Sequence, residues 1–232
     1  MNNDFDSGKC IITTGMKNQY SDIEMSFHDI AQNTDAWDEL RRKKLTASCS
    51  HTTGMAITTK GYTGLVDKKA YERAFNEPVE SEFSGNYSTQ RGHEMEPYAV
   101  EEYEKETYRE CCNGGFYQLG EYLGASPDSR LKGLNGGLEI KCFEHKHHED
   151  VLTNPDKFVK DNFEQVQFQM YVCGFDFIDL YAYHPNYRSY RVTIKPDMEF
   201  QEKLKANIEI METHIEAEMK RKLSLVRGYR EE

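Results

Sequence analysis

Three hydrophobic patterns in the second half of the chain predict its main elements. Apolar side chains recur at steps of three and four residues along 163–173, which predicts a core helix that ends at Gly174. The run Phe175–Tyr183 is apolar on both alternating faces, as expected of a strand that is covered on both sides. Apolar residues on one stripe of 204–223 predict a long amphipathic helix near the C-terminus.

The first half of the chain contains weaker signals for helices. The capping-type residues Asn33–Asp35 precede a short helix that would carry the basic run 41–44, and the stretch 66–77 again has helical spacing. Pro97 is tolerated in a first turn, so we expect a longer helix to begin there and to run to about Tyr108. These helices would flank the central part of the chain.

Turn residues divide the central segment 113–143 into short apolar runs, which predicts a β meander. Residues 1–30 are polar and irregular in pattern, and we interpret them as a poorly structured leader. The remaining residues, 31–232, suit a single domain. The predicted fold class is therefore α/β (α+β), with a central mixed β-sheet flanked by helices and a long C-terminal helix.

Composition narrows the class of protein. Hydrophobic residues make up 38% of the 232 residues, yet no window approaches the roughly 18 consecutive apolar residues of a membrane span. The N-terminus lacks the layout of a secretory signal and the six cysteines are scattered, so a reducing cytoplasm is the expected location, with no membrane partner. The formal net charge of -11 should repel nucleic acid unless basic groups line one groove.

The most informative chemistry lies at Asp128 and, eleven residues later, in Glu139–Lys141. Positions i and i+2 of a strand share a face, so Glu139 and Lys141 should project together while Ile140 points into the core. If Asp128 ends the neighbouring strand, two carboxylates and one ammonium meet at one spot. Metal-assisted phosphodiester hydrolysis needs such hard oxygen ligands and a nearby cation. The alternative is a solvent-facing Glu/Lys pair on a strand.

Further motifs follow in a fixed order along the chain. In that order they are Trp37, Arg41, Thr46-Ala47-Ser48, Gly92-His93-Glu94-Met95-Glu96-Pro97, Ser126-Pro127-Asp128, Leu138-Glu139-Ile140-Lys141-Cys142 and Gln165-Val166-Gln167. This series, within about residues 33–225, resembles the lambda exonuclease and YqaJ-type viral recombinase family. That family is a branch of the PD-(D/E)xK nucleases, so the resemblance implies a restriction-endonuclease-like core. Ser129 departs from the family pattern, which usually has glycine there.

The resemblance also implies a site for one or two Mg²⁺ ions, with Mn²⁺ as a substitute. The implied metal ligands are Asp128, Glu139, Glu96 and the backbone carbonyl of Ile140. Glu94 is a rival to Glu96 for the acidic position on the preceding helix. Lys141 looks like the residue that positions or activates the attacking water.

A pocket for the 5′-phosphate of a DNA end is a further implication of the resemblance. Arg41, Ser48 and Ser126 match its residues, and a guanidinium with hydroxyls can hold a terminal phosphate dianion. Arg42 is a weaker candidate in the same basic run. The alternative for that run is an ordinary solvated helix face.

Two glutamines compete for a place at the catalytic site. Gln165 matches the first glutamine of the family's helix motif and joins Asp128, Glu139, Lys141 and Glu96 as a candidate catalytic residue. The apolar stripe instead puts Gln167 on the core side and Gln165 nearly opposite. A third possibility is that both glutamines satisfy buried backbone groups.

The histidine-rich segment and the cysteines could in principle form other metal sites, but the sequence favours neither. The segment Phe143–Asp150 holds three histidines in four positions without the spacing of a helical HExxH motif, so we interpret it as an exposed loop. Some related nucleases carry an iron–sulfur cluster, but this chain has no cysteine after Cys173 and no close C-x-x-C pair.

The function that the resemblance implies is a Mg²⁺-dependent exonuclease acting on linear double-stranded DNA ends. It would degrade the 5′-ended strand in the 5′-to-3′ direction and leave 3′ overhangs for phage-type recombination. A homotrimer ring, a single-strand annealing protein as partner, and a phage or prophage origin in a bacterial cell are implied as well. The alternatives are an endonuclease, which would not need the 5′-phosphate pocket, and a non-catalytic DNA-end-binding module with a broken carboxylate set.

Overall fold

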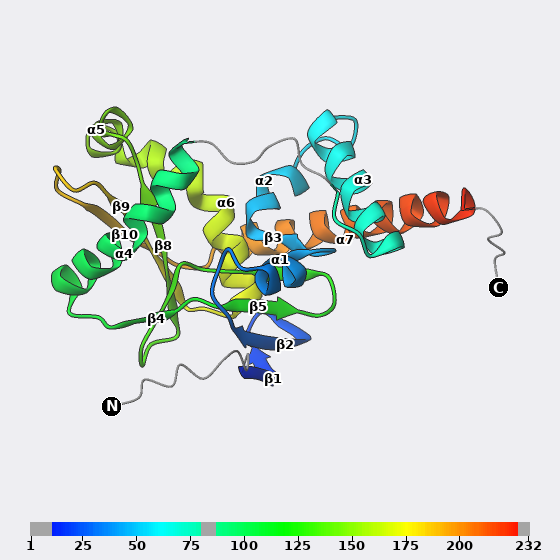
Figure 1. Ribbon diagram of the computed structural model, residues 1–232, viewed down its shortest axis with the longest axis horizontal. Helices are drawn as coiled ribbons and strands as arrows, with labels where there is room; N and C mark the ends of the chain where they lie inside the picture. Colours follow the sequence, from blue (N-terminus) through cyan, green and yellow to red (C-terminus); the bar gives the residue numbers. More distant parts are fainter. Residues whose placement is uncertain (1–10, 80–86, 227–232) are drawn as a thin grey trace.

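Two five-stranded sheets, with helices packed around them, form the computed structural model, which describes residues 11–79 and 87–226 (Figure 1). The first sheet has the order β1-β2-β5-β6-β3, and all its pairs are antiparallel except β3 with β6. Its strands are β1 (Ile11–Asn18), β2 (Ser21–Asp29), β3 (Leu45–Thr46), β5 (Phe116–Leu119) and β6 (Leu123–Ala125).

The second sheet has the order β10-β9-β8-β7-β4 and carries the chemistry discussed below. Its strands are β4 (Cys111–Asn113), β7 (Ser129–Leu131), β8 (Gly136–Cys142), β9 (Phe177–Tyr183) and β10 (Tyr190–Ile194). Strands β8 and β9 run parallel, and the connection that this requires is made by α5 (His145–Thr153) and α6 (Pro155–Cys173). The second sheet is therefore mixed.

The other helices pack around the two sheets. They are α1 (Asp35–Arg41), the short 3₁₀ turn η1 (Ala47–Cys49), α2 (Ser50–Thr53), α3 (Lys60–Phe75), α4 (Tyr87–Thr107) and α7 (Met198–Ser224). Helix α3 packs along α7, which extends away from the sheets (Figure 1). Helix α6 begins at the Asn154 cap with Pro155 in its first turn, and it ends at Gly174 in the left-handed conformation.

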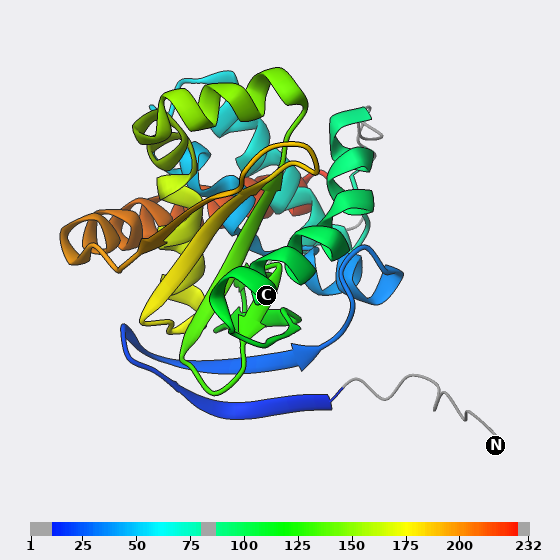
Figure 2. The ribbon, with the colours of Figure 1, turned by 90° about the vertical axis from the view of Figure 1, so that its left-hand side faces the viewer.

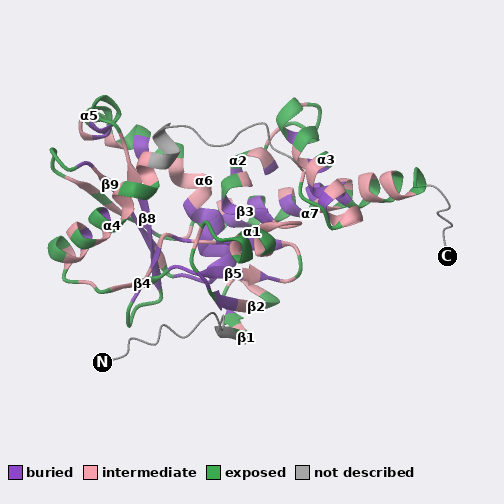
Figure 3. Cartoon of the chain, in the orientation of Figure 1, coloured by how far each residue is buried: buried purple, intermediate pink, exposed green. Residues whose placement is uncertain are grey.

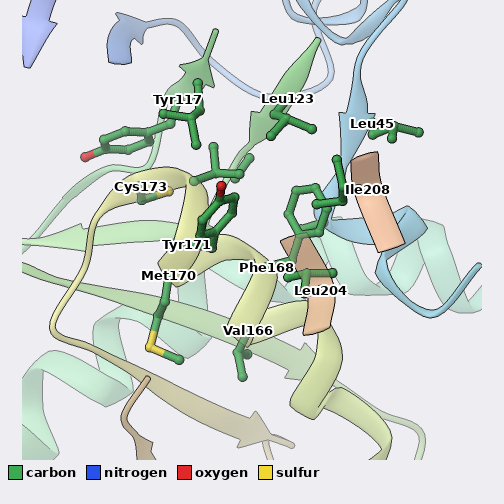
Figure 4. Close-up of a cluster of buried hydrophobic side chains, with 14 of the residues drawn as sticks. Leu45, Tyr117, Leu123, Val166, Phe168, Met170, Tyr171, Cys173, Leu204 and Ile208 are labelled. Carbon is green, nitrogen blue, oxygen red and sulfur yellow. The ribbon is translucent and has the colours of Figure 1, made fainter. Parts of the chain in front are cut away.

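The main hydrophobic core surrounds α6. Val166, Phe168, Met170, Tyr171 and Val172 are all nearly inaccessible, so the second half of this helix is buried on every side. Its neighbours come from both sheets and from α7, and Figure 4 shows those from the first sheet and α7. Because α6 contacts β5, β6 and β9, it lies between the two sheets and covers one face of the second sheet.

Helix α4 covers the opposite face of the second sheet, as the crossing of α4 in front of β8 in Figure 2 shows. A smaller core forms there around Tyr103, Leu138, Ile140 and Tyr181. Burial is deepest in α6, β8 and the strands near them, whereas the C-terminal end of α7 is exposed (Figure 3). The strand β8 is thus covered by helices on both faces.

Several predictions from the hydrophobic pattern are confirmed. The core helix ends at Gly174, the strand Phe177–Tyr183 is buried on both faces, and the long C-terminal helix is present. The α/β (α+β) class with a mixed sheet is confirmed as well, although the structure has two sheets and not one. The predicted meander is divided between them, because β5 and β6 pair in the first sheet and β7 and β8 in the second.

The prediction of a poorly structured leader over residues 1–30 is wrong for its described part, residues 11–30. Strands β1 and β2 form a hairpin, and β2 pairs with β5 (Figure 2). Met25 and Phe27 are buried against the main core. The sequence pattern did not predict this hairpin, because the hairpin is held in place by pairing of β2 with β5, which lies about ninety residues further along the chain. Residues 1–10 lie outside the described residues.

Two helix predictions also need correction. Pro97 lies inside α4 and does not begin it, and this is tolerated because Pro97 and His93 are exposed, so water can reach the carbonyl that loses its helical partner. Helix α3 begins at Lys60, earlier than the predicted 66, because Thr59 caps it by accepting from the backbone N–H of Tyr62.

The histidine-rich segment is not a loop. It forms α5, in which His148 is fully buried and its Nε2 lies 2.9 Å from the carbonyl oxygen of Arg188. Within residues 11–79 and 87–226, no three histidine, cysteine or acidic side chains are grouped so as to hold a metal ion by themselves. His148 is therefore part of the packing between α5 and the β9–β10 connection, whereas His145 and His147 are exposed.

Candidate active site

Asp128 lies at the open edge of β8. Strand β7 starts at the next residue, Ser129, and its register with β8 covers Gly137 and Leu138. Beyond Leu138, β7 no longer pairs with β8. There the side chain of Asp128 takes the place of the strand, and its Oδ2 accepts a hydrogen bond from the backbone N–H of Ile140 at 2.6 Å. The N–H and C=O of one strand residue face the same side, so the carbonyl of Ile140 faces this edge too.

Glu139 and Lys141 share one face of β8, as predicted. Lys141 Nζ donates to Glu139 Oε1 at 2.7 Å, and Glu139 is almost fully buried. Ile140 points to the other face, where it packs in the smaller core under α4. The alternative of a solvent-facing Glu/Lys pair is therefore wrong, because α6 covers the face that carries both side chains.

Helix α6 supplies two glutamines to Glu139. Gln165 Nε2 donates to Glu139 Oε1 at 2.6 Å, and its Oε1 accepts from Lys141 Nζ at 3.1 Å. Gln169 Nε2 donates to Glu139 Oε2 at 2.7 Å. The sequence interpretation missed Gln169, although its spacing of four residues from Gln165 places both on one helix face.

Gln167 lies on another face of α6 and binds the start of α7. Its Oε1 accepts from the backbone N–H of Asp197 at 2.9 Å, and its Nε2 donates to the carbonyl of Lys195 at 2.9 Å. The side chain is completely buried. Of the two predicted glutamines, Gln165 therefore lies at the site, whereas Gln167 forms hydrogen bonds with buried backbone groups.

We expect Gln167→Met to lower the free energy of unfolding by about 1–3 kcal/mol, because it leaves the backbone groups of Lys195 and Asp197 without their partner. Chemical denaturation in EDTA measures this change. A variant as stable as the unsubstituted protein would contradict the role of Gln167 in holding α7.

The site concentrates negative charge. Burial, and then the charges of Glu139 and Glu96, hold the pKa of Asp128 well above its usual range. Burial and the charge of Glu139 also raise the pKa of Glu96. Burial alone would lower the pKa of Lys141, but attraction to Glu139 and Asp128 raises it overall. The ammonium group of Lys141 thus lies close to the charges of Glu139 and Asp128.

Of the two acidic candidates on α4, Glu96 is the one whose charge contributes to the raised pKa of Asp128, and Glu94 is exposed. The two residues are two positions apart on a helix, which turns their side chains to different faces.

The donor set fits a hard divalent cation such as Mg²⁺. Asp128 and Glu139 offer carboxylate oxygens, the Ile140 carbonyl faces the same edge, and the mutual repulsion of the carboxyl groups would be relieved by a cation. Mg²⁺ commonly takes one or two carboxylates and keeps several waters. The two carboxylates of the β7–β8 region therefore suffice without a third protein side chain.

Arg41, Ser48 and Ser126 gather around Trp37. The Arg41 guanidinium lies 4.1 Å from the centre of the Trp37 ring, and Arg41 Nη2 is 3.4 Å from Ser48 Oγ. Trp37 Nε1 donates to Ser126 Oγ at 2.9 Å. Thr46 Oγ1 lies 3.0 Å from Ser48 Oγ and adds another hydroxyl.

Arg41 is a half-buried cation that forms no ion pair with a carboxylate in the described part of the chain. Burial lowers its pKa, and the charges of Cys49 and Asp38 oppose this shift. Arg42, by contrast, is paired with Glu39 at 2.7 Å. Arg41 is therefore available to bind an anion, whereas the charge of Arg42 is already paired with Glu39.

One residue bonded to each cluster lines a common cavity. This cavity of about 920 Å³ between η1, α2 and α6 is lined by both Ser48 and Gln165. Gln165 is hydrogen-bonded to Glu139, and Ser48 lies 3.4 Å from Arg41.

The second sheet is mixed and carries Asp128 at the open edge of β8, with Glu139 and Lys141 on one face of that strand and the glutamines of α6 against them. This arrangement defines a restriction-endonuclease-like nuclease fold of the PD-(D/E)xK class. Residues 36–176 match the family model described as "YqaJ-like viral recombinase domain". This match spans more than half of the chain, so the protein belongs to that family.

Solved structures of exonucleases share the fold. An alkaline exonuclease from Laribacter hongkongensis superposes with a TM-score of 0.72 at 24% identity, over 82% of this chain and 98% of that chain. The same enzyme in complex with dAMP gives 0.70 at 23% identity, over 81% and 95%. A phage-related exonuclease from Haemophilus somnus 129PT gives 0.61 at 16% identity, over 74% and 93%.

A comparison with curated proteins finds no match. Among the helices of residues 11–79 and 87–226, none combines the length and the apolar character needed to cross a membrane.

Proposed function

We propose that this protein is a Mg²⁺-dependent 5′-to-3′ exonuclease that degrades one strand of linear double-stranded DNA and leaves 3′ single-stranded overhangs. The observation that carries the proposal is the presence of two clusters whose bonded neighbours, Gln165 and Ser48, line a common cavity. One is the acidic cluster at the edge of β8, and the other is the guanidinium of Arg41 with its hydroxyls. An exonuclease needs both a reaction centre and a group that recognises the strand end.

Asp128, Glu139 and the carbonyl of Ile140 would hold the first Mg²⁺, and Glu96 would face a second; Mn²⁺ would substitute. When bound, the metal supplies Lewis-acid stabilisation of the charge that develops at the scissile phosphate.

Lys141 is the group that we assign to the attacking water. Its Nζ is fixed between Glu139 Oε1 at 2.7 Å and Gln165 Oε1 at 3.1 Å, so it uses two of its three donors on protein. The third can donate to the water or to a phosphate oxygen. The charges of Glu139 and Asp128 raise the pKa of Lys141, so in the metal-free site the amine is a positive charge and a hydrogen-bond donor.

The proposed end specificity rests on Arg41. A terminal phosphate offers a dianion that an internal phosphodiester does not, and a guanidinium with neighbouring hydroxyls suits it. The complex of the Laribacter enzyme with dAMP supports a nucleoside monophosphate as the released product. An endonuclease of the same class would not require this pocket, and an end-binding module would not require an intact carboxylate set.

The test is digestion of linear duplex DNA, with and without a 5′-phosphate, beside a covalently closed circle. Each substrate is incubated in Mg²⁺ and in EDTA, with the unsubstituted protein and with Lys141→Ala. We expect Mg²⁺-dependent loss of one strand from the linear DNA alone, faster with the phosphate and absent in the variant. Cutting of the circle would instead establish the endonuclease, and binding without cutting would establish the end-binding module.

We expect Arg41→Ala to reduce the preference for 5′-phosphorylated over 5′-hydroxyl ends by about 10–100-fold, since a hydrogen bond to a charged group contributes about 1.5–3 kcal/mol. Initial rates on the two linear substrates measure the preference. Arg42→Ala is the neighbouring comparison and should retain it, because Arg42 is already paired with Glu39. An unchanged preference in Arg41→Ala would remove the pocket from the proposal.

The proposal includes the cellular setting that the family resemblance implies. We expect a homotrimer ring around the duplex, a single-strand annealing protein that takes up the 3′ overhang, and a phage or prophage gene expressed in bacterial cytoplasm. Size-exclusion chromatography with light scattering tests the trimer.

A further inference from the structure

Gln169 has no assigned role, yet it is among the most buried polar residues. It is 1% exposed, and its Nε2 donates to Glu139 Oε2 at 2.7 Å. Its other amide atom, Oε1, is buried and has no hydrogen-bond partner within the described part of the chain. A buried acceptor left without a donor lowers stability, so its presence requires a reason other than stability.

The orientation of this amide follows from chemistry. A carboxylate accepts hydrogen bonds and an amide NH₂ donates them, so the NH₂ end of Gln169 must face Glu139. The opposite orientation would set two oxygens against each other. Gln169 can therefore bind Glu139 only while its own Oε1 is directed away, into a place without a donor.

The two carboxylate oxygens of Glu139 differ in how many of their lone pairs are already used in hydrogen bonds. Oε1 accepts from both Lys141 Nζ and Gln165 Nε2, which uses its two lone pairs. Among the described residues, Oε2 accepts from Gln169 alone, which leaves one lone pair open. Within the carboxylate, Oε2 is thus the atom that can still bind a cation.

We infer that Gln169 is a positioning residue, which holds Glu139 by Oε2 so that the remaining lone pair of this oxygen is presented to the metal. The inference rests on the proposed function and adds to it the identity of the ligating oxygen and of the residue that orients it. Outer groups that orient metal ligands affect metal affinity about 10–100-fold. A purely structural glutamine would affect stability and leave metal affinity unchanged.

The test uses two glutamines of the same helix as a matched pair. Gln169→Met removes the hydrogen bond to Glu139 with little change in volume, and Gln167→Met removes the bonds to the start of α7. Isothermal titration with Mn²⁺ and the Mg²⁺ concentration at half-maximal cleavage are measured for both. We expect Gln169→Met to weaken Mn²⁺ binding and to raise the Mg²⁺ requirement about 10–100-fold, while Gln167→Met changes neither.

The result separates the inference from the proposed function. If the unsubstituted protein binds Mn²⁺ and cleaves DNA, and Gln169→Met binds Mn²⁺ equally well, the inference is overturned and the function stands. If the unsubstituted protein neither binds Mn²⁺ nor cleaves, the function itself fails.

A measurement on the unsubstituted chain covers the case in which Gln169→Met does not fold. The side-chain NH₂ signals of Gln167 and Gln169 are followed by ¹⁵N NMR while Mg²⁺ is added. We expect the Gln169 signal to shift with Mg²⁺ and the Gln167 signal to stay in place. Equal, small shifts of both would overturn the inference.

Discussion

An Asp128→Asn variant is expected to cleave linear duplex DNA about a thousandfold more slowly than the unsubstituted protein, which corresponds to about 4 kcal/mol of transition-state stabilisation. The amide oxygen of the introduced asparagine could still accept from the backbone N–H of Ile140, so the hairpin should keep its geometry. What the substitution removes is the negative charge that a metal needs. Single-turnover cleavage in Mg²⁺ measures the effect.

The same variant should be at least as stable as the unsubstituted protein in EDTA. Because the folded-state pKa of Asp128 is raised, the metal-free protein binds a proton more readily than the unfolded chain and loses stability as the pH rises through that pKa. Asparagine resembles the protonated acid, so thermal unfolding between mildly acidic and neutral pH should depend less on pH in Asp128→Asn.

Asp176→Asn is the matched control, since Asp176 is exposed and bonds Gln19 at the far end of β9. Its cleavage rate should equal that of the unsubstituted protein. A rate for Asp128→Asn within tenfold of that value would refute the assignment of Asp128.

Gly114→Ala is expected to reduce cleavage at least about a hundredfold and to lower the free energy of unfolding by about 1–3 kcal/mol. A Cβ atom at Gly114 would lie 1.8 Å from the carbonyl oxygen of Pro127 and 3.1 Å from the carbonyl carbon of Asp128. Both contacts are with backbone, which has no flexible end to move aside. The segment that carries Asp128 would have to shift away from β8.

Gly64→Ala provides the control for adding a methyl group. Gly64 lies in α3 with nothing within 4 Å of the added Cβ, so this variant should gain about 0.5–1 kcal/mol and keep full activity. Denaturation curves and cleavage rates of both variants are compared. Full activity in Gly114→Ala would mean that the position of Asp128 is not critical.

The local arrangement of the site could be read from the chain because it depends on short spacings. Glu139 and Lys141 are two positions apart on a strand, and that alone puts them on one face, 2.7 Å apart at their tips. Whether this face is covered could not be read in the same way. It depends on α6, which arrives from more than twenty residues further along the chain.

The choice between neighbouring candidates also required tertiary structure. The family resemblance favoured Gln165 over Gln167 and Glu96 over Glu94, but the apolar stripe of the core helix favoured Gln167. The direction of each side chain depends on how α6 and α4 are rotated against β8, and packing of the whole helix sets that rotation. Gln169 was missed because nothing in a single helix indicates which buried amide meets a charge.

The amino-acid sequence alone determined the class of protein, the strand that carries Glu139 and Lys141, the core helix with its end at Gly174, and the set of acidic and basic residues from which a nuclease site could be built. The class of protein follows from the resemblance of the ordered motif series to a known family, and the other features follow from periodicity and from chemistry within a few residues. The tertiary structure decided the order in the N-terminal hairpin, the bond of Gln169 to Glu139, and the shared cavity of Ser48 and Gln165. They join segments up to more than a hundred residues apart, and such contacts depend on the packing of the whole chain, which no local pattern encodes.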